Sequence, residues 1–496
     1  MLTIARWVAC ALFLAPMAQA DGVDTVFGGT LIVRDPSQAG PFGSCVTDIT
    51  QTVDVGGVEL VQFAARAFFP QAPDAGANCV LTGPERPLVL IYHALGAGPE
   101  DYEVLGRRLA SHGMVVASLE FSDDLTEAIT ALDEEIGAFL SDDVALIGHS
   151  RGGDLMVERR RQPIPLGKRV AAMVLMAPRV SEQPLVPQYE LTGVESFLGL
   201  HWTGDNDSAT WGKPSLNAGG VRTSVFRIYD RAGVDFDAPD QLGLTKHFVF
   251  FDLGLHFTQA DPEITAYTTA FLRRYLLGDF LQDRFLKGIT PPEGLDPANH
   301  PVLQQHEEPT RIMFANFEES GPAPTPFNGL RTEGVTAFPP AIFAFSDPFS
   351  PHDLGVLRFH FNALTEDEHR LAIRLFEPGV EATGMTHLSF RMAQEYRPER
   401  AQSGEALIFD VCVFSGGERC VTRTLPFPIV NEIVVAQTGE RVDATKNAMR
   451  TYRVRLSQLG VSSGDLVQGV SFDFSQSGQL VGERHDLAVD QVQLTR

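Results

Sequence analysis

Apolar residues in the first part of the chain fall into two recurring patterns. Short unbroken apolar runs are typical of buried strands, and stretches with an apolar residue every three or four positions are typical of helices. Strands are expected at residues 58–70, 87–93, 114–119, 144–147, 170–176, 197–202 and 247–252, and helices at 99–112, 124–140, 154–161 and 264–286. Strands that alternate with helices indicate βαβ units and a mainly parallel sheet.

The pattern changes after residue 286. Residues 287–309 carry several prolines with glycine and asparagine, which favour loops, and we expect a linker there. From residue 310 onward the chain shows short alternating strands with almost no helical pattern between them. We therefore expect an α/β domain over 21–286, followed by an all-β sandwich of jelly-roll type over 310–496.

Residues 1–20 have the pattern of a secretory signal peptide. Arg6 is the only charged residue, an apolar stretch follows it, and Ala18-Gln19-Ala20 is a small-residue cleavage signal. We expect a secreted or periplasmic protein whose mature chain begins near Asp21. No later stretch is long and apolar enough to predict a membrane span.

Four cysteines remain outside the signal segment, and an even number in an exported chain favours disulfides. Cys412 and Cys420 are equally spaced from Gly416 in an expected hairpin, so we expect them to face each other on adjacent strands. Cys45 and Cys79 then pair by elimination. Free buried thiols are the alternative.

The net charge of −24 at pH 7 argues against nucleic acids and anionic membranes as partners, because both are polyanions. Hydrophobic residues make up 44% and charged residues 21% of the chain, which is ordinary for a globular protein. The sequence contains no H-E-x-x-H, P-loop, Rossmann G-x-G-x-x-G or paired C-x-x-C pattern. We expect neither a metal nor a cofactor.

The stretch from Val144 to Gly153 carries the strongest chemical signal in the sequence. Apolar residues run directly into Gly148-His149-Ser150-Arg151-Gly152, a G-x-S-x-G, and good helix formers follow. A strand, a sharp turn and a helix are the context of a nucleophile elbow, in which the serine hydroxyl stands clear of the sheet near a helix N-terminus. The pattern also occurs by chance, but with its flanking elements it predicts Ser150 as a nucleophile.

A nucleophilic serine needs a base, and an acid that orients the base. His256 follows the last predicted strand of the domain in a short glycine-containing loop, and we expect it to be the base; a structural loop histidine is the alternative. The acid is expected after the strand at 197–202, where Asp205 and Asp207 both stand. We favour Asp205, because its distance from the strand end matches the usual turn, with Asp207 as the alternative.

Two backbone N–H groups should stabilise the oxyanion that forms during acyl transfer. One belongs to Arg151, the residue after the nucleophile. The other is expected in the loop from His93 to Gly96, which follows the first buried strand, and there we favour Leu95 over Ala94. A plain turn that leads into a helix is the alternative for this loop.

These residues resemble the α/β-hydrolase superfamily over about 55–285. Gly-His-Ser-Arg-Gly-Gly at 148–153 resembles the elbow of chlorophyllases. The stretch from Pro87 to Leu119 resembles the strand, oxyanion loop and helix of cutinase-like polyesterases, dienelactone hydrolases and platelet-activating-factor acetylhydrolases. The resemblance implies an α/β-hydrolase fold, a mainly parallel sheet flanked by helices, and a cofactor-free Ser-His-Asp esterase.

Carried across by position, the family roles fall on Ser150, Asp205 and His256, with Arg151 and Leu95 as amide donors. The chain departs from the family in two places. Alanine follows His93 where the family's oxyanion loop usually has glycine, and residues 206–245 form a longer excursion than usual between the acid and base strands.

The expected sandwich domain resembles the jelly-roll modules attached to secreted hydrolases. Such modules often bind sugars through exposed tryptophans, and the three tryptophans of this chain all lie before residue 310. A structural, targeting or calcium-stabilised module is therefore an alternative, and contact with a surface or a polymer through this domain is a further expectation.

The sequence thus predicts an exported serine hydrolase that cleaves carboxylic esters of the esterase, lipase or polyesterase type through an acyl-enzyme. The substrate is expected to be a small-molecule or polymeric ester. One alternative is a non-catalytic exported binding or scaffold protein. Another is a peptidase or thioesterase that uses the same triad, because acyl specificity depends on pocket shape.

Overall fold

The structure of the protein, a computed structural model, describes separate stretches of the chain between residues 23 and 496. The described residues are 23–26, 29–32, 35–55, 59–71, 79, 83–120, 125–159, 166–178, 191, 193–202, 228–230, 232–235, 238–251, 261–295, 302–315, 331–333, 341–344, 355–362, 370–374, 379–395, 406–427, 432–434, 441–443, 448–475 and 484–496. The expected signal peptide at 1–20 lies outside these residues.

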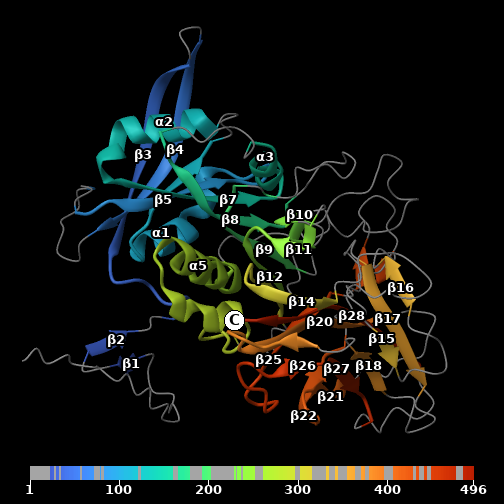
Figure 1. Ribbon diagram of the computed structural model, residues 1–496. Coiled ribbons are helices and arrows are strands. Elements are labelled where there is room, and N and C mark those ends of the chain that lie inside the picture. Colours follow the sequence, from blue (N-terminus) through green and yellow to red (C-terminus); the bar gives the residue numbers. More distant parts are fainter. Residues whose placement is uncertain are drawn as a thin grey trace, which may run out of the picture.

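Nine strands form the largest sheet (Figure 1). They are β3 (Gly43–Val55), β4 (Glu59–Gln71), β5 (Arg86–Tyr92), β6 (Val115–Leu119), β7 (Leu140–His149), β8 (Arg169–Met176), β9 (Ser196–Trp202), β12 (Thr245–Phe251) and β13 (Val302–Glu307). Their order across the sheet is β13-β12-β9-β8-β7-β5-β6-β4-β3. The six strands from β12 to β6 run parallel, whereas β13, β4 and β3 pair antiparallel with their neighbours.

The central strands are apolar on both sides because each side of the sheet carries its own core. Alternate residues of a strand point to opposite faces, so Leu88 and Leu90 of β5 join one cluster while Val89 and Ile91 join the other. Helices α2 (Leu125–Ile136) and α3 (Arg151–Arg159) contribute to the first cluster. Helices α1 (Glu103–Ser111) and α5 (Pro262–Leu276) contribute to the second.

The other described helices are short. They are α6 (Asp283–Leu286), the 3₁₀ turns η1 (Pro99–Tyr102), η2 (Gly137–Phe139) and η4 (Phe280–Gln282), and a helical segment at 228–230. Within the described ranges, no helix combines the length and the apolar character that crossing a membrane would require.

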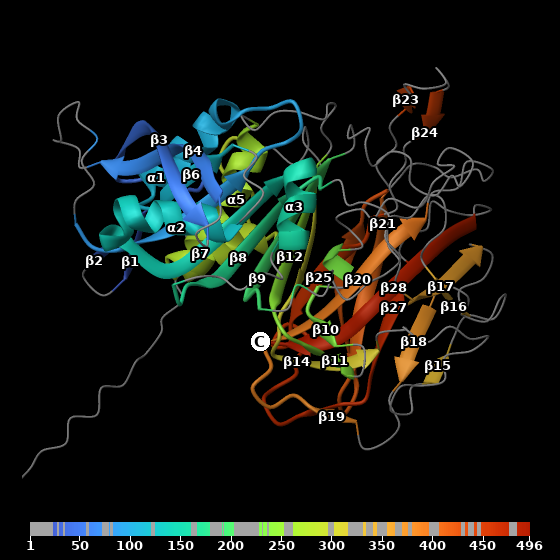
Figure 2. The same cartoon turned by 90° about the horizontal axis from the view of Figure 1, so that it is seen from above.

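The C-terminal part is built from two antiparallel sheets that share one core. One has the order β16-β17-β28-β20-β25, with β14 also paired to β28, and the other has the order β15-β18-β27-β21-β22. Their strands are β14 (Arg311–Ala315), β15 (Arg331–Glu333), β16 (Ala341–Ala344), β17 (Gly355–Asn362), β18 (Arg370–Arg374), β20 (His387–Glu395), β21 (Leu407–Phe414), β22 (Glu418–Leu425), β25 (Arg450–Arg455), β27 (Gly469–Asp473) and β28 (Arg484–Thr495). Phe390 of β20 and Phe409 of β21 lie in the shared core. Figure 2 shows these sheets beside the nine-stranded sheet.

The remaining strands form two-stranded antiparallel pairs. These pairs are β1 (Val23–Val26) with β2 (Gly29–Ile32), β10 (Val234–Asp235) with β11 (Ala238–Leu242), β19 (Val380–Glu381) with β26 (Leu466–Val467), and β23 (Glu432–Val434) with β24 (Arg441–Asp443).

A buried cluster of charged side chains joins the nine-stranded sheet to the C-terminal sheets. The Arg391 guanidinium on β20 donates to Asp230 at 2.9 Å and to Asp490 on β28. Glu307 on β13 pairs with Lys246 at 3.3 Å and with Arg311 at 2.8 Å. All six side chains are at most 2% exposed. Opposite charges at these distances compensate part of the cost of removing each from water.

The expected fold class, an α/β-hydrolase fold followed by a jelly-roll-like sandwich, is wrong. The described chain is mostly β, its nine-stranded sheet is mixed, its other sheets are small and antiparallel, and its helices are few. The prediction extended the alternation of strands and helices around residues 87–176 to the whole domain. It missed β3, whose alternating polar and apolar residues form a long antiparallel pair with β4.

The expected linker at 287–309 also differs from the structure. Residues 302–307 form β13, which pairs antiparallel with β12 along its whole length. This part of the expected linker therefore belongs to the nine-stranded sheet, and β14 in the C-terminal sheets begins only at Arg311.

Candidate active site

Ser150 occupies a sharp turn between β7 and α3. Its φ is 50°, in the left-handed region that non-glycine residues rarely adopt. The Ser150 N–H donates to the Met176 carbonyl of β8 at 2.9 Å, and the Ser150 carbonyl accepts from Gly153 N at 3.0 Å. These bonds hold the strained conformation between the end of a strand and the first turn of a helix.

The two glycines that flank Ser150 allow close approach of the backbone. A Cβ on Gly148 would lie 2.6 Å from Gly153 Cα. A Cβ on Gly152 would lie 2.2 Å from the Tyr92 carbonyl oxygen at the end of β5. Both contacts are with main chain, which cannot rotate away. A side chain at either position would therefore collide with neighbouring backbone.

Arg151 is the first residue of α3, so its N–H group lies at a helix N-terminus, where backbone N–H groups lack partners within the helix. Its guanidinium pairs with Asp154 on the same helix at 3.1 Å. The ion pair holds the Arg151 side chain along α3. The role expected for Arg151, stabilising an oxyanion, needs only its backbone N–H group.

The loop after β5 contains the expected second amide donor. Ala94 N–H donates to the Tyr102 hydroxyl at 3.1 Å, so this amide is already used within the protein. Leu95 is 66% exposed and precedes Gly96, whose φ is 83°. Of the two donors considered from the sequence, the geometry favours Leu95 over Ala94.

Tyr102 links this loop to the turn that carries Ser150. Its hydroxyl lies 2.7 Å from His149 Nδ1 and also accepts from Ala94 N. Burial raises the pKa of Tyr102, so the hydroxyl keeps its proton and can donate it to His149 Nδ1. That bond would leave the proton of the neutral imidazole on Nε2. Sequence reasoning missed Tyr102, which lies 47 positions before His149.

Asp205, Asp207 and His256 lie outside the described residues, so the structure does not bring them to Ser150 or separate them from it. The strands before them are described. The parallel pairing of β9 with β12 sets Trp202 opposite Phe251, and the pairing of β7 with β8 sets His149 opposite Met176. The carboxyl ends of these strands therefore share the sheet edge where Ser150 stands.

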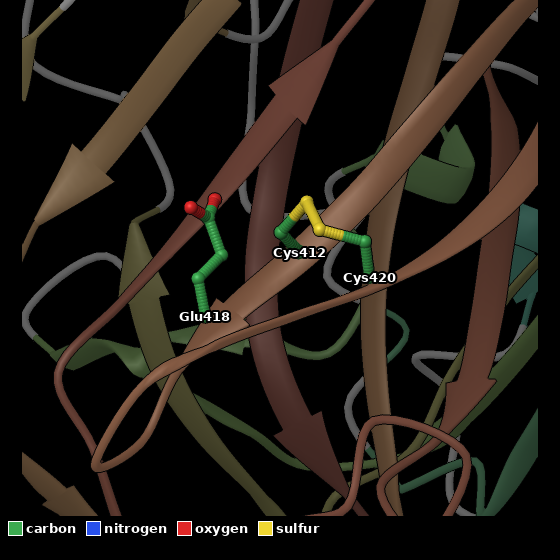
Figure 3. Close-up of side chains that lie close together, drawn as sticks. All are labelled: Cys412, Glu418 and Cys420. Carbon is green, nitrogen blue, oxygen red and sulfur yellow. A yellow bond between two sulfur atoms is a disulfide. The ribbon is translucent and has the colours of Figure 1, made fainter.

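Both expected disulfides are present. Cys412 and Cys420 are opposite each other on β21 and β22, with Cα atoms 4.0 Å apart, and Cys45 and Cys79 have Cα atoms 5.6 Å apart. Figure 3 shows Glu418 close to the Cys412–Cys420 bond. These three residues do not make a metal site while the disulfide is intact, because a cysteine binds a metal as a thiolate. The two bonds are consistent with an extracellular location.

No protein-family model matches this chain, and no curated protein is similar to it.

Proposed function

We propose that this protein is an exported serine hydrolase that cleaves carboxylic esters, with Ser150 as its nucleophile. The observation that carries the proposal is the conformation of Ser150, whose φ is 50° between two glycines that approach the backbone too closely for any side chain. Strained backbone of this kind persists where the surrounding structure holds it, and it is frequent at active sites.

In the proposed reaction, the Ser150 oxygen attacks the ester carbonyl carbon while His256 takes the hydroxyl proton. Asp205 orients His256 and stabilises its charged form. The N–H groups of Arg151 and Leu95 stabilise the negative charge on the carbonyl oxygen. His256 then gives its proton to the leaving alcohol, and water releases the acyl group by the same steps.

The shared strand edge supports the proposed partners. Asp205 comes three positions after β9 ends at Trp202, and His256 comes five positions after β12 ends at Phe251. Loops that leave one edge of a parallel sheet are the usual source of catalytic residues in such sheets.

The first experiment measures hydrolysis of p-nitrophenyl esters of short and medium acyl chains by the purified protein and by Ser150→Ala. We expect turnover by the parent, and a loss of at least about a thousandfold in the variant, because a missing nucleophile removes the covalent route. Ser463→Ala is the matched control, since Ser463 is exposed in the C-terminal part.

Labelling by a fluorophosphonate separates the alternatives. An ester hydrolase incorporates the probe at Ser150, and a mass spectrum of the peptide shows the site. A folded parent that neither labels nor hydrolyses any ester would point to a binding protein instead. A parent that labels and cleaves only amides or thioesters would move the proposal to a peptidase or a thioesterase. An active Ser150→Ala would refute Ser150 as the nucleophile.

A further inference from the structure

A cavity of about 430 Å³ lies between the end of α6, β13 and the edges of the two C-terminal sheets. Five of the residues that line it are cationic: Lys287, Arg423, Arg450, Arg453 and Arg455. His387 also lines it, but burial and the neighbouring arginines lower the pKa of its imidazole to about 4, so this side chain is neutral at pH 7. This concentration of basic groups stands out in a chain with a net charge of −24. The residues that line the cavity begin at Lys287, so all of them follow the proposed catalytic residues Ser150, Asp205 and His256 in the sequence.

Two edge strands supply most of the basic groups. Arg450, Arg453 and Arg455 come from β25, the edge of one sheet, and Arg423 comes from β22, the edge of the other. The Tyr452 hydroxyl donates to the Thr424 carbonyl at 2.9 Å and ties the two edges together. The basic side chains are therefore attached to a rigid framework.

The carboxylates around the cavity neutralise only part of this charge. Lys287 pairs with Asp283 at 3.2 Å and with Glu308, which also lies 3.2 Å from His306. Within the described residues, Arg423, Arg450 and Arg455 make no ion pair with a carboxylate.

Arg453 already donates to Thr495 Oγ1 and to the Arg496 carbonyl, so the arginines with the most capacity left for an anion are Arg423, Arg450 and Arg455. The Arg423 guanidinium donates to the Thr422 carbonyl at 2.8 Å, and Arg450 lies 5.5 Å from the centre of the Tyr452 ring. Arg423 and Arg453 are partly buried, and this burial lowers the pKa of each guanidinium. An anion in the cavity would relieve the cost of this burial.

We propose that this cavity binds a small molecule that carries a phosphate or sulfate group. The planar guanidinium group offers paired N–H donors that match the oxygens of phosphate and sulfate. A cavity of about 430 Å³ is in the range that holds a small organic ligand and is too small for a folded partner. The inference does not depend on the proposed esterase.

The test is titration calorimetry of the purified protein with pyrophosphate, inorganic phosphate and sulfate at constant ionic strength. We expect saturable binding of at least one of them, with a Kd of about 1 mM or tighter. The double variant Arg450→Gln/Arg455→Gln should weaken it by about tenfold or more, since each charge-assisted hydrogen bond contributes strongly. Both arginines have side chains that reach solvent, so the variant should fold.

Arg419→Gln is the matched control, because Arg419 lies on β22 four positions before Arg423 and does not line the cavity. It should bind as the parent does. Arg423→Gln is a second, independent variant that should weaken binding. Preference for pyrophosphate or phosphate would identify a phosphorylated ligand, and preference for sulfate a sulfated one. The proposal is refuted if the parent binds none of the three anions, or if the double variant binds as tightly as the parent.

Discussion

Ser150 and its neighbours have little freedom to change at the scale of single residues. The main-chain oxygen of Tyr92 lies only 2.2 Å from the position of a Cβ on Gly152, and the carbonyl of Met176 accepts a hydrogen bond from the Ser150 amide. The G-x-S-x-G pattern is local, so the sequence alone could predict this turn. Gly148 is required by its closeness to Gly153 within the same turn, but the contact that requires Gly152 comes from the end of β5, which no local pattern identifies.

Gly152→Ala should lower the free energy of unfolding by about 1–3 kcal/mol and abolish esterase activity, because its Cβ would lie 2.2 Å from a carbonyl oxygen. Urea unfolding and ester hydrolysis measure the two effects. Gly417→Ala is the control, since a Cβ there meets nothing within 4 Å. A stable and active Gly152→Ala variant would mean that the elbow is looser than the structure indicates.

Tyr102→Phe should lower kcat by about tenfold or more and leave KM nearly unchanged. The change removes the hydroxyl that bridges Ala94 N and His149 Nδ1, and each lost hydrogen bond costs about 1–3 kcal/mol when its partner stays buried. Tyr102 acts here as a positioning residue for the oxyanion loop and the Ser150 turn.

Tyr275→Phe is the control for Tyr102→Phe. Tyr275 lies on α5 and is also buried, and its hydroxyl lies 2.7 Å from Nε2 of His247 on β12. It should lose stability with little change in kcat. Equal losses of kcat in the two variants would show that the effect of Tyr102 is general destabilisation.

At the scale of elements, the apolar pattern predicted the central strands well. The runs at 87–93, 170–176 and 197–202 correspond to β5, β8 and β9, because a strand covered on both faces must be apolar throughout. The edge strands were harder to predict. β13 reads Val-Leu-Gln-Gln-His-Glu. Its residues Gln305 and Glu307 are buried because β12, β14 and β20 supply charged or hydrogen-bonding partners.

The sequence also predicted the local part of the candidate site but not its contacts between distant residues. The local elbow is present, but Tyr102 is coupled to His149 only through the folded structure. The expected acid and base, Asp205 and His256, stay predictions because they lie outside the described residues.

Acidification should destabilise the contact between α5 and β12. Burial lowers the pKa of His247 to about 3, so the folded protein resists protonation there, while an unfolded histidine titrates near 6.5. Below pH 6.5 the unfolded state binds more protons, and the free energy of unfolding falls as the pH falls. Between pH 6.5 and 4.5 this one group contributes a loss of about 2 kcal/mol.

Urea unfolding at the two pH values checks this, with His247→Phe and Tyr275→Phe compared. Both variants remove the hydrogen bond between the two side chains, but only His247→Phe removes the titrating group. The pH dependence should shrink in His247→Phe and persist in Tyr275→Phe. The charged groups near His247 are Asp283, Lys287 and Arg274, and they are present in both variants. If the free energy of unfolding changed equally with pH in both variants, His247 would not be the group responsible.

At the scale of the whole molecule, the buried charged cluster connects the nine-stranded sheet to the C-terminal sheets. Burial alone would raise the pKa of Glu307. The positive charges of Lys246 and Arg391 outweigh this effect and lower that pKa below its usual value, so the Glu307 carboxylate is charged. Buried pairs of this kind add little net stability when intact, but losing one member exposes the full cost of the other.

Arg391→Met should therefore lower the free energy of unfolding by about 3–5 kcal/mol, because Asp230 and Asp490 lose this partner while buried. Thermal unfolding followed by circular dichroism measures it. Arg169→Met is the control, because Arg169 pairs with Asp143 and Glu195 at the surface, where ion pairs contribute little. A melting temperature equal to the parent's in Arg391→Met would contradict a role for the cluster in joining the two parts.

The pairing of β28 sets an order in which the protein can be completed during synthesis. β28 lies between β17 and β20 and also pairs with β14. These three strands are synthesised earlier and lack this hydrogen-bonding partner until residues 484–495 have been made. Until then, β20 and β17 present unpaired edges, which favour association with other chains. The nine-stranded sheet has all its strands once β13 is made. The nine-stranded sheet can therefore form before synthesis is finished, whereas the C-terminal sheets depend on pairing between strands as far apart in sequence as β14 and β28. We expect the C-terminal sheets to fold more slowly.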